Sequence, residues 1–416
     1  MILDYLNSFF DALFYAFIYV AVAVTLFYLL MGVAVLIGKR RQGSNLQKGD
    51  EPYVTVQIPT YNELAALNCA KKCLEFDYPA EKYKIIIGDD SNDPNVSALI
   101  DEFAHEHSDM VTVTRRGKNT GYKPGNLNHM LKYSDGELLV IFDSDFLPEK
   151  DFLRRIVAPF ADEGVSVVQA KWNLHNFSQN LISIAGGTIS LICHNIALPF
   201  MHRVSGTSFL CGSAEAIRKK DLVAVGGWQA GSLTEDVECS LRLIKAGRRL
   251  VYLEDLECKC EAPYTLRDLC RQQMRWAFGV ISAFKQHIFD ILKGRAVSRI
   301  EKCNVLIFAS GYLFAVLLLA ITAFGLLTVI STRPGPIDWP RFLSETARNI
   351  SLTSGFILSS AIALGISRKF RDVPRMILSS LSIGLVLTVF VNMGIAKALF
   401  NRTMKWFMLQ KNGNAI

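Results

Sequence analysis

Residues 138–148 constrain the fold of this 416-residue chain more than any other segment, because they join a buried strand to a pair of carboxylates. The apolar first half of the segment predicts a parallel strand that is covered on both faces. The strand ends at Asp143-Ser144-Asp145, and alternation along an extended chain turns the two aspartates the same way. Two such carboxylates repel each other unless a cation lies between them, and a hard divalent ion prefers oxygen ligands. The segment therefore predicts a ligand site at the carboxyl edge of a sheet.

The neighbouring residues alternate between strand and helix patterns, with polar residues after each predicted strand. Strands are predicted over residues 54–59, 84–87, 111–114, 138–142, 165–172 and 249–253, with a strand and turn over 208–213. Helices are predicted in most of the intervals, and the last strand is followed by a helix over 264–283. This order predicts an α/β domain with a doubly wound sheet and a site along one edge.

Two of the predicted strand ends carry groups that suit a nucleotide. Asp89 and Asp90 follow the second strand and can accept hydrogen bonds from a base or from ribose hydroxyls, although an Asx turn explains them equally well. Lys123 lies between Gly121 and Gly125, where small residues let the backbone approach a phosphate. A solvated basic turn is the alternative interpretation of that segment.

An acidic group opens a predicted helix further along the chain. Thr234 is a natural N-cap residue, and Glu235 and Asp236 suit the first turn because their charges complement the helix dipole. A carboxylate at this position can also act as a general base that removes a proton from a hydroxyl group. The pattern allows both interpretations.

The helix predicted over 264–283 carries a basic stripe beside an aromatic residue. Arg275 could contact a pyrophosphate and Trp276 could lie under a sugar ring. A helix on the membrane surface explains the same stripe equally well.

Four apolar segments predict that the chain is anchored in a membrane. They cover residues 14–37, 305–330, 352–366 and 376–400. Basic clusters at 39–41, 299–302 and 368–371 are expected to face the cytoplasm, which places the start of the chain outside. The tail lies outside if the fourth segment crosses fully, and inside if its second half lies flat on the membrane. A further apolar stretch, 181–199, has a central histidine and is predicted to be a buried or membrane-skimming helix.

Charge and cysteine content limit the functions that remain. The net charge of +7 arises from clusters beside the apolar segments, which indicates contact with an anionic leaflet and argues against nucleic acid binding. The nine cysteines show no zinc-ribbon spacing, and a cytoplasmic domain is expected to keep them as free thiols.

Taken together, these segments resemble the family 2 inverting glycosyltransferases, and in particular their membrane-embedded, processive branch. The motifs that carry the resemblance are, in chain order, Asp89-Asp90, Asp143-Ser144-Asp145, Thr234-Glu235-Asp236 and Gln272-Gln273-Met274-Arg275-Trp276. Residues 121–128, 142–148 and 168–172 further resemble the cellulose-synthase-like mannan and glucan synthases. The resemblance covers roughly residues 50–285.

The resemblance implies a Rossmann-like GT-A domain with a mixed, mostly parallel sheet, together with transmembrane helices. The implied divisions are an N-terminal transmembrane helix at 12–38, a cytoplasmic GT-A domain at 50–260, interfacial helices at 261–302, C-terminal transmembrane helices at 303–400 and a tail at 401–416. The expected location is the inner or plasma membrane.

The resemblance also implies roles for individual residues. The donor nucleotide sugar would be bound by Thr60, Glu63, Asp89, Asp90, Lys123, Asp143, Asp145, Gln272 and Arg275. Asp145, with Asp143, would hold Mg²⁺ or Mn²⁺. Asp236 would be the general base, with Glu235 and Arg275 as its catalytic neighbours. The acceptor would contact Trp276 and the Cys211-Gly212 turn, which replaces the family's Gly-Thr-Gly.

The implied reaction transfers a hexose from a nucleotide sugar to a growing β-linked polysaccharide. UDP-glucose is the favoured donor and GDP-mannose is the alternative. A second interpretation is a glycolipid synthase that adds one sugar to a diacylglycerol, a ceramide or a polyprenyl phosphate. A third is a non-catalytic sensor or scaffold that binds a sugar nucleotide. Because four spans are few for a polymer channel, an oligomer or an accessory export partner is expected.

Overall fold

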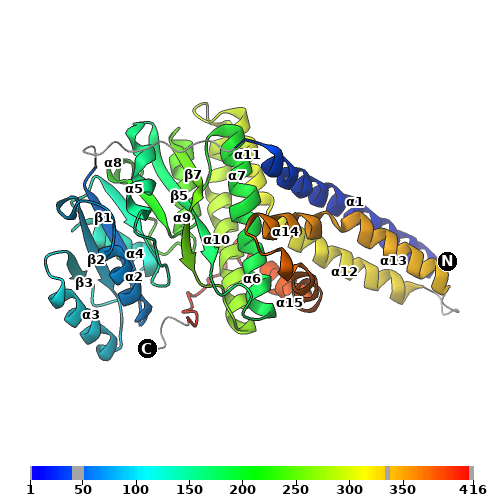
Figure 1. Ribbon diagram of the computed structural model, residues 1–416. Helices are drawn as coiled ribbons and strands as arrows, with labels where there is room; N and C mark the ends of the chain where they lie inside the picture. The colour runs from blue at the N-terminus through cyan, green and yellow to red at the C-terminus, as the bar shows by residue number, and fades with distance from the viewer. Residues whose placement is uncertain (1, 40–50, 333–337, 412–416) are drawn as a thin grey trace.

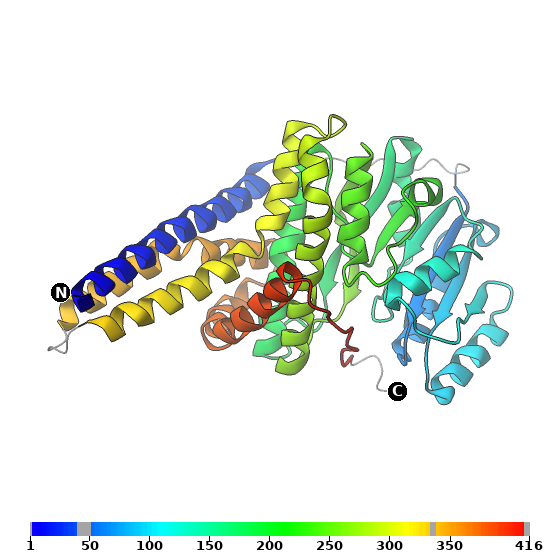
Figure 2. The same cartoon turned by 180° about the vertical axis from the view of Figure 1, so that it is seen from behind.

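The computed structural model describes residues 2–39, 51–332 and 338–411, and it has two visibly different parts (Figure 1). One part is a sheet covered by helices on both faces. The other is an arm of long helices that extends away from the sheet domain. Figure 2 shows the same arrangement from behind, with the segment after α15 returning to the sheet domain.

The sheet has seven strands in the order β3-β2-β1-β4-β6-β5-β7. They are β1 (Val54–Thr60), β2 (Tyr83–Asp89), β3 (Val111–Thr114), β4 (Leu138–Ile141), β5 (Val165–Leu174), β6 (Glu215–Arg218) and β7 (Arg249–Cys260). Strands β1 to β4 are parallel, β6 is antiparallel to both of its neighbours, and β7 is parallel to β5. The predicted mixed, mostly parallel sheet is therefore confirmed.

Alternation along the strands builds a separate core on each face of the sheet. Val140 and Phe142 belong to the core under α2 (Ala65–Leu74), α3 (Pro94–Glu106) and α5 (Phe152–Val157). Leu139 and Ile141 belong to the core under α4 (Tyr122–Leu131), α8 (Lys219–Ala224), α9 (Glu235–Lys245) and α10 (Leu266–Lys293). All four side chains are fully buried, and burial of this kind contributes about 1.5–3 kcal/mol per side chain. Packing on both faces of the sheet fixes the register of the strands and therefore the position of the residues at their ends.

The predicted strand and turn at 208–213 is the main local difference from expectation. The chain forms no strand there, and β6 begins at Glu215. Gly212 (φ +92°) and Ala214 (φ +52°) both adopt left-handed backbone conformations, which interrupt an extended chain. The N–H groups of Leu210 and Cys211 donate to side chains of Ser240 and Gln169 rather than to backbone carbonyls of a neighbouring strand.

The arm consists of α1 (Ile2–Ile37), α12 (Leu313–Ser331), α13 (Trp339–Thr353) and α14 (Gly355–Ile366), the last two meeting at a 45° bend. At the far end, Asn7 donates to Thr328 O at 2.8 Å. At the near end, Arg203 of the sheet domain donates to Val35 O at 2.7 Å and Asn195 donates to Ala363 O at 2.7 Å. In the part of the chain described here, four helices are long and apolar enough to cross a membrane, or up to five if the bent pair forms one span.

Two of these apolar helices do not lie along the arm. The segment formed by α6 (Leu181–Ile192), a π-helical turn (Cys193–Ala197) and α7 (Leu198–Ser205) packs inside the protein, with 72% of its most apolar window buried. This agrees with the prediction of a buried helix there. The other is α15 (Val373–Leu399), which packs against α10.

Helix α15 contacts the sheet domain at both of its ends. Before it begins, Asp372 accepts a hydrogen bond of 2.5 Å from Ser178 Oγ. After it ends, Lys285 of α10 donates to Leu399 O and to Asn401 Oδ1, both at 2.9 Å. Along its length, a Cβ on Gly394 would lie 2.3 Å from Met274 O, so the two helices approach closely. Both ends of α15 and the start of the tail therefore lie against the sheet domain.

We therefore predict that residues on either side of α15 are accessible from the same face of the membrane. In a background that lacks the exposed Cys303, Arg371→Cys and Arg402→Cys should react with an impermeant maleimide from one side of sealed vesicles. Asp338→Cys, at the far end of the arm, should react only from the other side. Labelling of Arg371→Cys and Arg402→Cys from opposite sides would show that α15 crosses the bilayer.

Candidate active site

A cavity that is open to solvent lies at the carboxyl ends of β1 and β4. Residues from β1, from the segment after β4, and from helices α4, α9 and α10 line it. The sequence-predicted residues that it brings together are Thr60, Glu63, Asp90, Lys123, Asp143, Asp145, Cys211, Gly212, Glu235, Asp236, Gln272, Arg275 and Trp276. Residues far apart in the sequence therefore share one cavity.

Asp89 is the predicted site residue that does not line this cavity. Its carboxylate accepts from Ser97 Oγ at 2.7 Å, from Arg115 Nε at 2.8 Å and from the Ser91 N–H at 2.9 Å. Burial alone would raise the pKa of Asp89, but these hydrogen bonds hold the pKa below its ordinary value. Asp89 thus anchors the loop after β2, whereas Asp90 lies in the cavity wall, paired with Arg116.

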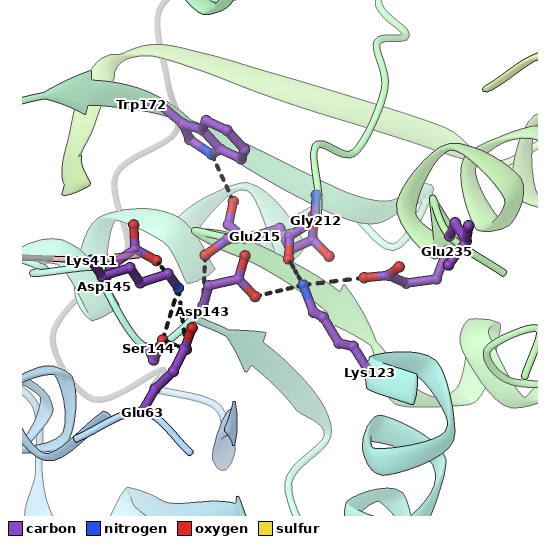
Figure 3. A network of polar contacts seen from close by, with 12 residues as sticks. Glu63, Lys123, Asp143, Ser144, Asp145, Trp172, Gly212, Glu215, Glu235 and Lys411 are labelled. Atoms are coloured by element: carbon purple, nitrogen blue, oxygen red, sulfur yellow. Dashed lines mark hydrogen bonds and ion pairs between the residues drawn. The ribbon is translucent and has the colours of Figure 1, made fainter. Parts of the chain in front are cut away.

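Lys123 connects three parts of the cavity wall. Its ammonium lies 2.7 Å from Asp143 Oδ1 and 3.1 Å from Glu235 Oε1, and it donates to Gly212 O (Figure 3). Burial alone would lower the pKa of Lys123, but the two carboxylates raise it well above its ordinary value. Lys123 therefore stays charged and holds the segment after β4, the first turn of α9 and the Cys211-Gly212 turn around one cation.

A second ammonium group, that of Lys411, lies on the other side of Asp143 (Figure 3). It is 2.7 Å from Asp145 Oδ1, 2.9 Å from Ser144 Oγ and 3.2 Å from Glu63 Oε2. No role was predicted for Lys411, because an isolated lysine in the tail carries no local signal. Only the path of the chain brings it here.

Aromatic contacts hold the tail against the cavity. Trp406 packs edge-on against Tyr61 with ring centroids 5.8 Å apart. The Arg271 guanidinium lies over the Phe407 ring, 4.8 Å from its centroid. Such cation–π contacts contribute about 0.5–2 kcal/mol, depending on how far the cation is desolvated. Trp406, Phe407 and Lys411 therefore line the same cavity as the predicted residues.

The carboxylates at this edge fit a divalent cation whose coordination the substrate completes. Among residues 2–39, 51–332 and 338–411, no group of three or more His, Cys, Asp or Glu side chains forms a metal site. Mg²⁺ is commonly held by only one or two carboxylates together with phosphate oxygens and water. Asp143 and Asp145 supply such a pair, and in this structure Lys411 neutralises Asp145.

Asp236 lies in the first turn of α9 and is partly exposed to the cavity. Burial among protein atoms, followed by the nearby charge of Glu235, raises the pKa of Asp236 to about 7. Thr234 occupies the predicted N-cap position, but its side chain makes no capping hydrogen bond. The carboxylate of Asp236 is thus suited to accept a proton near neutral pH.

Close packing of α10 on α9 brings Arg275 to the same end of the cavity. A Cβ on Gly279 would lie 2.5 Å from Thr234 Cγ2, so the glycine is needed for the two helices to meet. Arg275 Nη1 donates to Leu233 O at 2.9 Å, which fixes the guanidinium just before α9 begins. Its remaining donors are free to bind an anion in the cavity.

Comparison with known proteins places this chain among the glycosyltransferases. The family model described as "Glycosyltransferase like family 2" matches residues 52–279, which is more than half of the chain. The chain therefore belongs to this family, as its motifs suggested.

Two rice (Oryza sativa subsp. japonica) proteins are among its relatives. The probable glucomannan 4-beta-mannosyltransferase 7 is 30% identical over 274 residues, covering 62% of this chain and 46% of the relative. Glucomannan 4-beta-mannosyltransferase 1 is 29% identical over 272 residues, covering 61% of this chain and 50% of the relative. The chain thus spans about half the length of these relatives.

A solved structure shares the fold over nearly the whole chain. It is the mannosyltransferase PcManGT from Pyrobaculum calidifontis in complex with GDP-Man and Mn²⁺, with a TM-score of 0.67 and 19% identity. The match covers 95% of this chain and 100% of that one. The similarity confirms the predicted GT-A fold.

We predict that Lys411 competes with a divalent cation at Asp145 when no donor is bound. Replacing the ammonium by a methyl group, in Lys411→Met, should tighten Mn²⁺ binding about tenfold because a charge-assisted contact with Asp145 is lost. Lys405→Met, which removes an exposed lysine of the same tail, is the control. Calorimetric titration with Mn²⁺ measures the difference, and equal or weaker binding to Lys411→Met would contradict the assignment.

Proposed function

We propose that this chain is an inverting hexosyltransferase that transfers a sugar from a nucleoside diphosphate to a glycan hydroxyl group. The observation that carries the proposal is the composition of one cavity. It holds a carboxylate pair for a cation, the partly buried cations Lys123 and Arg275, and a separate carboxylate, that of Asp236, with a pKa near 7. A non-catalytic sensor would have no need for a carboxylate tuned to accept protons.

GDP-mannose is the donor that we propose. The sequence alone favoured UDP-glucose, but the rice relatives are named as mannosyltransferases and the structurally similar enzyme was solved with GDP-Man. These names support mannose transfer by this chain. We place the nucleoside in the part of the cavity lined by Thr60 and Asp90, at the ends of β1 and β2.

The diphosphate would lie between the carboxylate pair and α10. Asp145 and Asp143 would hold Mn²⁺ or Mg²⁺ there, and the cation would offset the negative charge of the departing nucleoside diphosphate. Lys123 and Arg275 are the protein cations that bind the phosphate oxygens in this proposal. Lys411 must leave Asp145 when the cation binds, and a phosphate oxygen is then the natural partner of its ammonium.

Asp236 would act on the opposite side of the sugar. It accepts the proton of the acceptor hydroxyl while that oxygen bonds to the anomeric carbon and the bond to the diphosphate oxygen breaks. A single displacement of this kind inverts the anomeric centre without a covalent enzyme intermediate. Trp276 and Gly212, which line the cavity with Asp236, would contact the acceptor sugar.

A growing β-linked glycan is the acceptor that we propose, at the cytoplasmic face of a membrane. The relatives named as glucomannan mannosyltransferases support a polysaccharide over a glycolipid. The arm offers few helices for a polymer channel, because α15 lies along the membrane in this proposal and does not add a span. We therefore propose that export of a long product requires an oligomer or an accessory partner.

The first test is a panel of nucleotide sugars given to the purified full chain with Mn²⁺, Mg²⁺ or EDTA. GDP-mannose should release nucleoside diphosphate at least tenfold faster than UDP-glucose, and EDTA should stop the release. The product should form a ladder that an endo-β-mannanase digests. A preference for UDP-sugars, activity in EDTA, or a single organic-soluble glycolipid would each contradict the corresponding part of the proposal.

The second test removes the base. Asp236→Asn should lower kcat for transfer by about 10²–10⁴-fold, because the hydroxyl loses its proton acceptor, while the Kd for GDP-mannose changes little. Asp221→Asn is the control, because it also removes an acidic group; the Asp221 carboxylate pairs with Arg248 outside the cavity. A transfer rate that survives Asp236→Asn would show that another group is the base.

The third test uses pH. Because Asp236 must be ionised to accept a proton, transfer should be slow below the pKa of about 7 and should rise as the pH increases through it. Glu235→Gln removes a like charge and should move this rise to lower pH. A pH profile of kcat/KM that is flat between pH 6 and 8 in both proteins would contradict the assignment.

A further inference from the structure

A buried carboxyl group behind the cavity wall has no part in the reaction proposed above. Glu215 is the first residue of β6, in the interior of the sheet, and only 1% of it is exposed. Its neighbours in the sheet register are Ile141 of β4 and Gln169 of β5. Burying a carboxyl group at such a position costs free energy of folding unless the group makes hydrogen bonds. Glu215 therefore calls for an explanation.

Glu215 fixes the turn that precedes its own strand. Its Oε2 accepts from the Gly212 N–H at 2.9 Å, and Gln169 Oε1 accepts from the Cys211 N–H at 2.7 Å. Gly212 has a φ of +92°, which is the left-handed region that favours glycine. Two side chains from neighbouring strands thus hold a turn that lacks regular backbone hydrogen bonds.

This turn touches both the phosphate side and the acceptor side of the proposed reaction. The Gly212 carbonyl accepts from Lys123 Nζ. A Cβ on Gly212 would lie 3.4 Å from Asp236 Oδ2 and 3.6 Å from Lys123 Nζ. Gly212 therefore lies beside both the proposed base and the lysine, and a shift of the turn would change the surroundings of both.

Burial favours the protonated form of Glu215 at neutral pH, and charged and titratable groups surround it. Lys123 of α4 faces it, as do Glu235, Asp236 and Cys239 of α9 and Cys211 in the turn itself. Burial, opposed by Lys123 and reinforced by the charge of Asp236, raises the pKa of Glu215 to about 8. A protonated carboxyl group can still accept from Gly212 without adding a negative charge beside the base.

We propose that Glu215 is a positioning residue that holds the Cys211-Gly212 turn in register with Lys123 and Asp236. This inference rests on the proposed function, because it takes Asp236 as the base. Loss of the hydrogen bond from Gly212 frees the turn. Ionisation of Glu215 places another negative charge beside Asp236. The ionised Glu215 carboxylate then competes with the donor phosphates for Lys123.

The test compares Glu215→Gln with Glu215→Met in the full chain. Glutamine keeps an oxygen that accepts from Gly212, whereas methionine is similar in length and offers no such oxygen. At pH 7, Glu215→Gln should transfer within about threefold of wild type. Glu215→Met should lose about tenfold or more in the ratio of transfer to donor hydrolysis, because water still reaches the bound sugar while the base is displaced. Equal ratios in folded Glu215→Met and wild type would overturn the proposal.

The pH dependence supplies a readout that a merely structural role would not change. Between pH 7 and 9, the KM for GDP-mannose should rise at least threefold in wild type and stay constant in Glu215→Gln. If Glu215→Met does not fold, the comparison of wild type with Glu215→Gln alone tests the proposal. A parallel rise of the KM in these two proteins overturns it. A wild-type protein that transfers no sugar from any nucleotide donor would instead refute the proposed function.

Discussion

The ammonium group of Lys123 is the interaction on which the geometry of the cavity depends. Asp143, Glu235 and the Gly212 carbonyl come from separate parts of the chain, and each directs negative charge at the same point. Without a buried cation, these groups would repel one another in a region of low dielectric constant. Lys123 therefore holds the segment after β4, the start of α9 and the 211–213 turn around one point of the cavity.

The sequence predicted the sheet and most of the cavity because both follow from local patterns. The end of a buried strand at Ile141 places Asp143 and Asp145 at one edge of the sheet, and α10 carries Arg275 and Trp276 at positions that its helical period sets. The strand predicted within the 208–213 segment is wrong because the N–H groups of Leu210, Cys211 and Gly212 donate to side chains. No local pattern encodes such partners.

Tertiary packing decides the remaining features. Lys411 reaches Asp145 only because the segment after α15 returns to the sheet domain. The sequence of α15 alone allows either a membrane span or an interfacial helix. Contacts of residues flanking α15, such as Asp372 with Ser178, hold the helix against the sheet domain. Asp89 was grouped with Asp90 by sequence, yet Arg115 holds it outside the cavity. Each of these outcomes depends on a partner distant in sequence.

In the proposed mechanism, one cavity binds a sugar diphosphate between the cation-binding carboxylates and Arg275, with Asp236 facing the anomeric carbon. An experimental structure of the base-deficient Asp236→Asn protein with GDP-mannose and Mn²⁺ would show whether it does. We expect Mn²⁺ at Asp145, the diphosphate within hydrogen-bonding distance of Arg275 and Lys123, and residue 236 on the far side of the anomeric carbon from the diphosphate. A donor bound outside this cavity, or with its anomeric carbon turned away from residue 236, would contradict it.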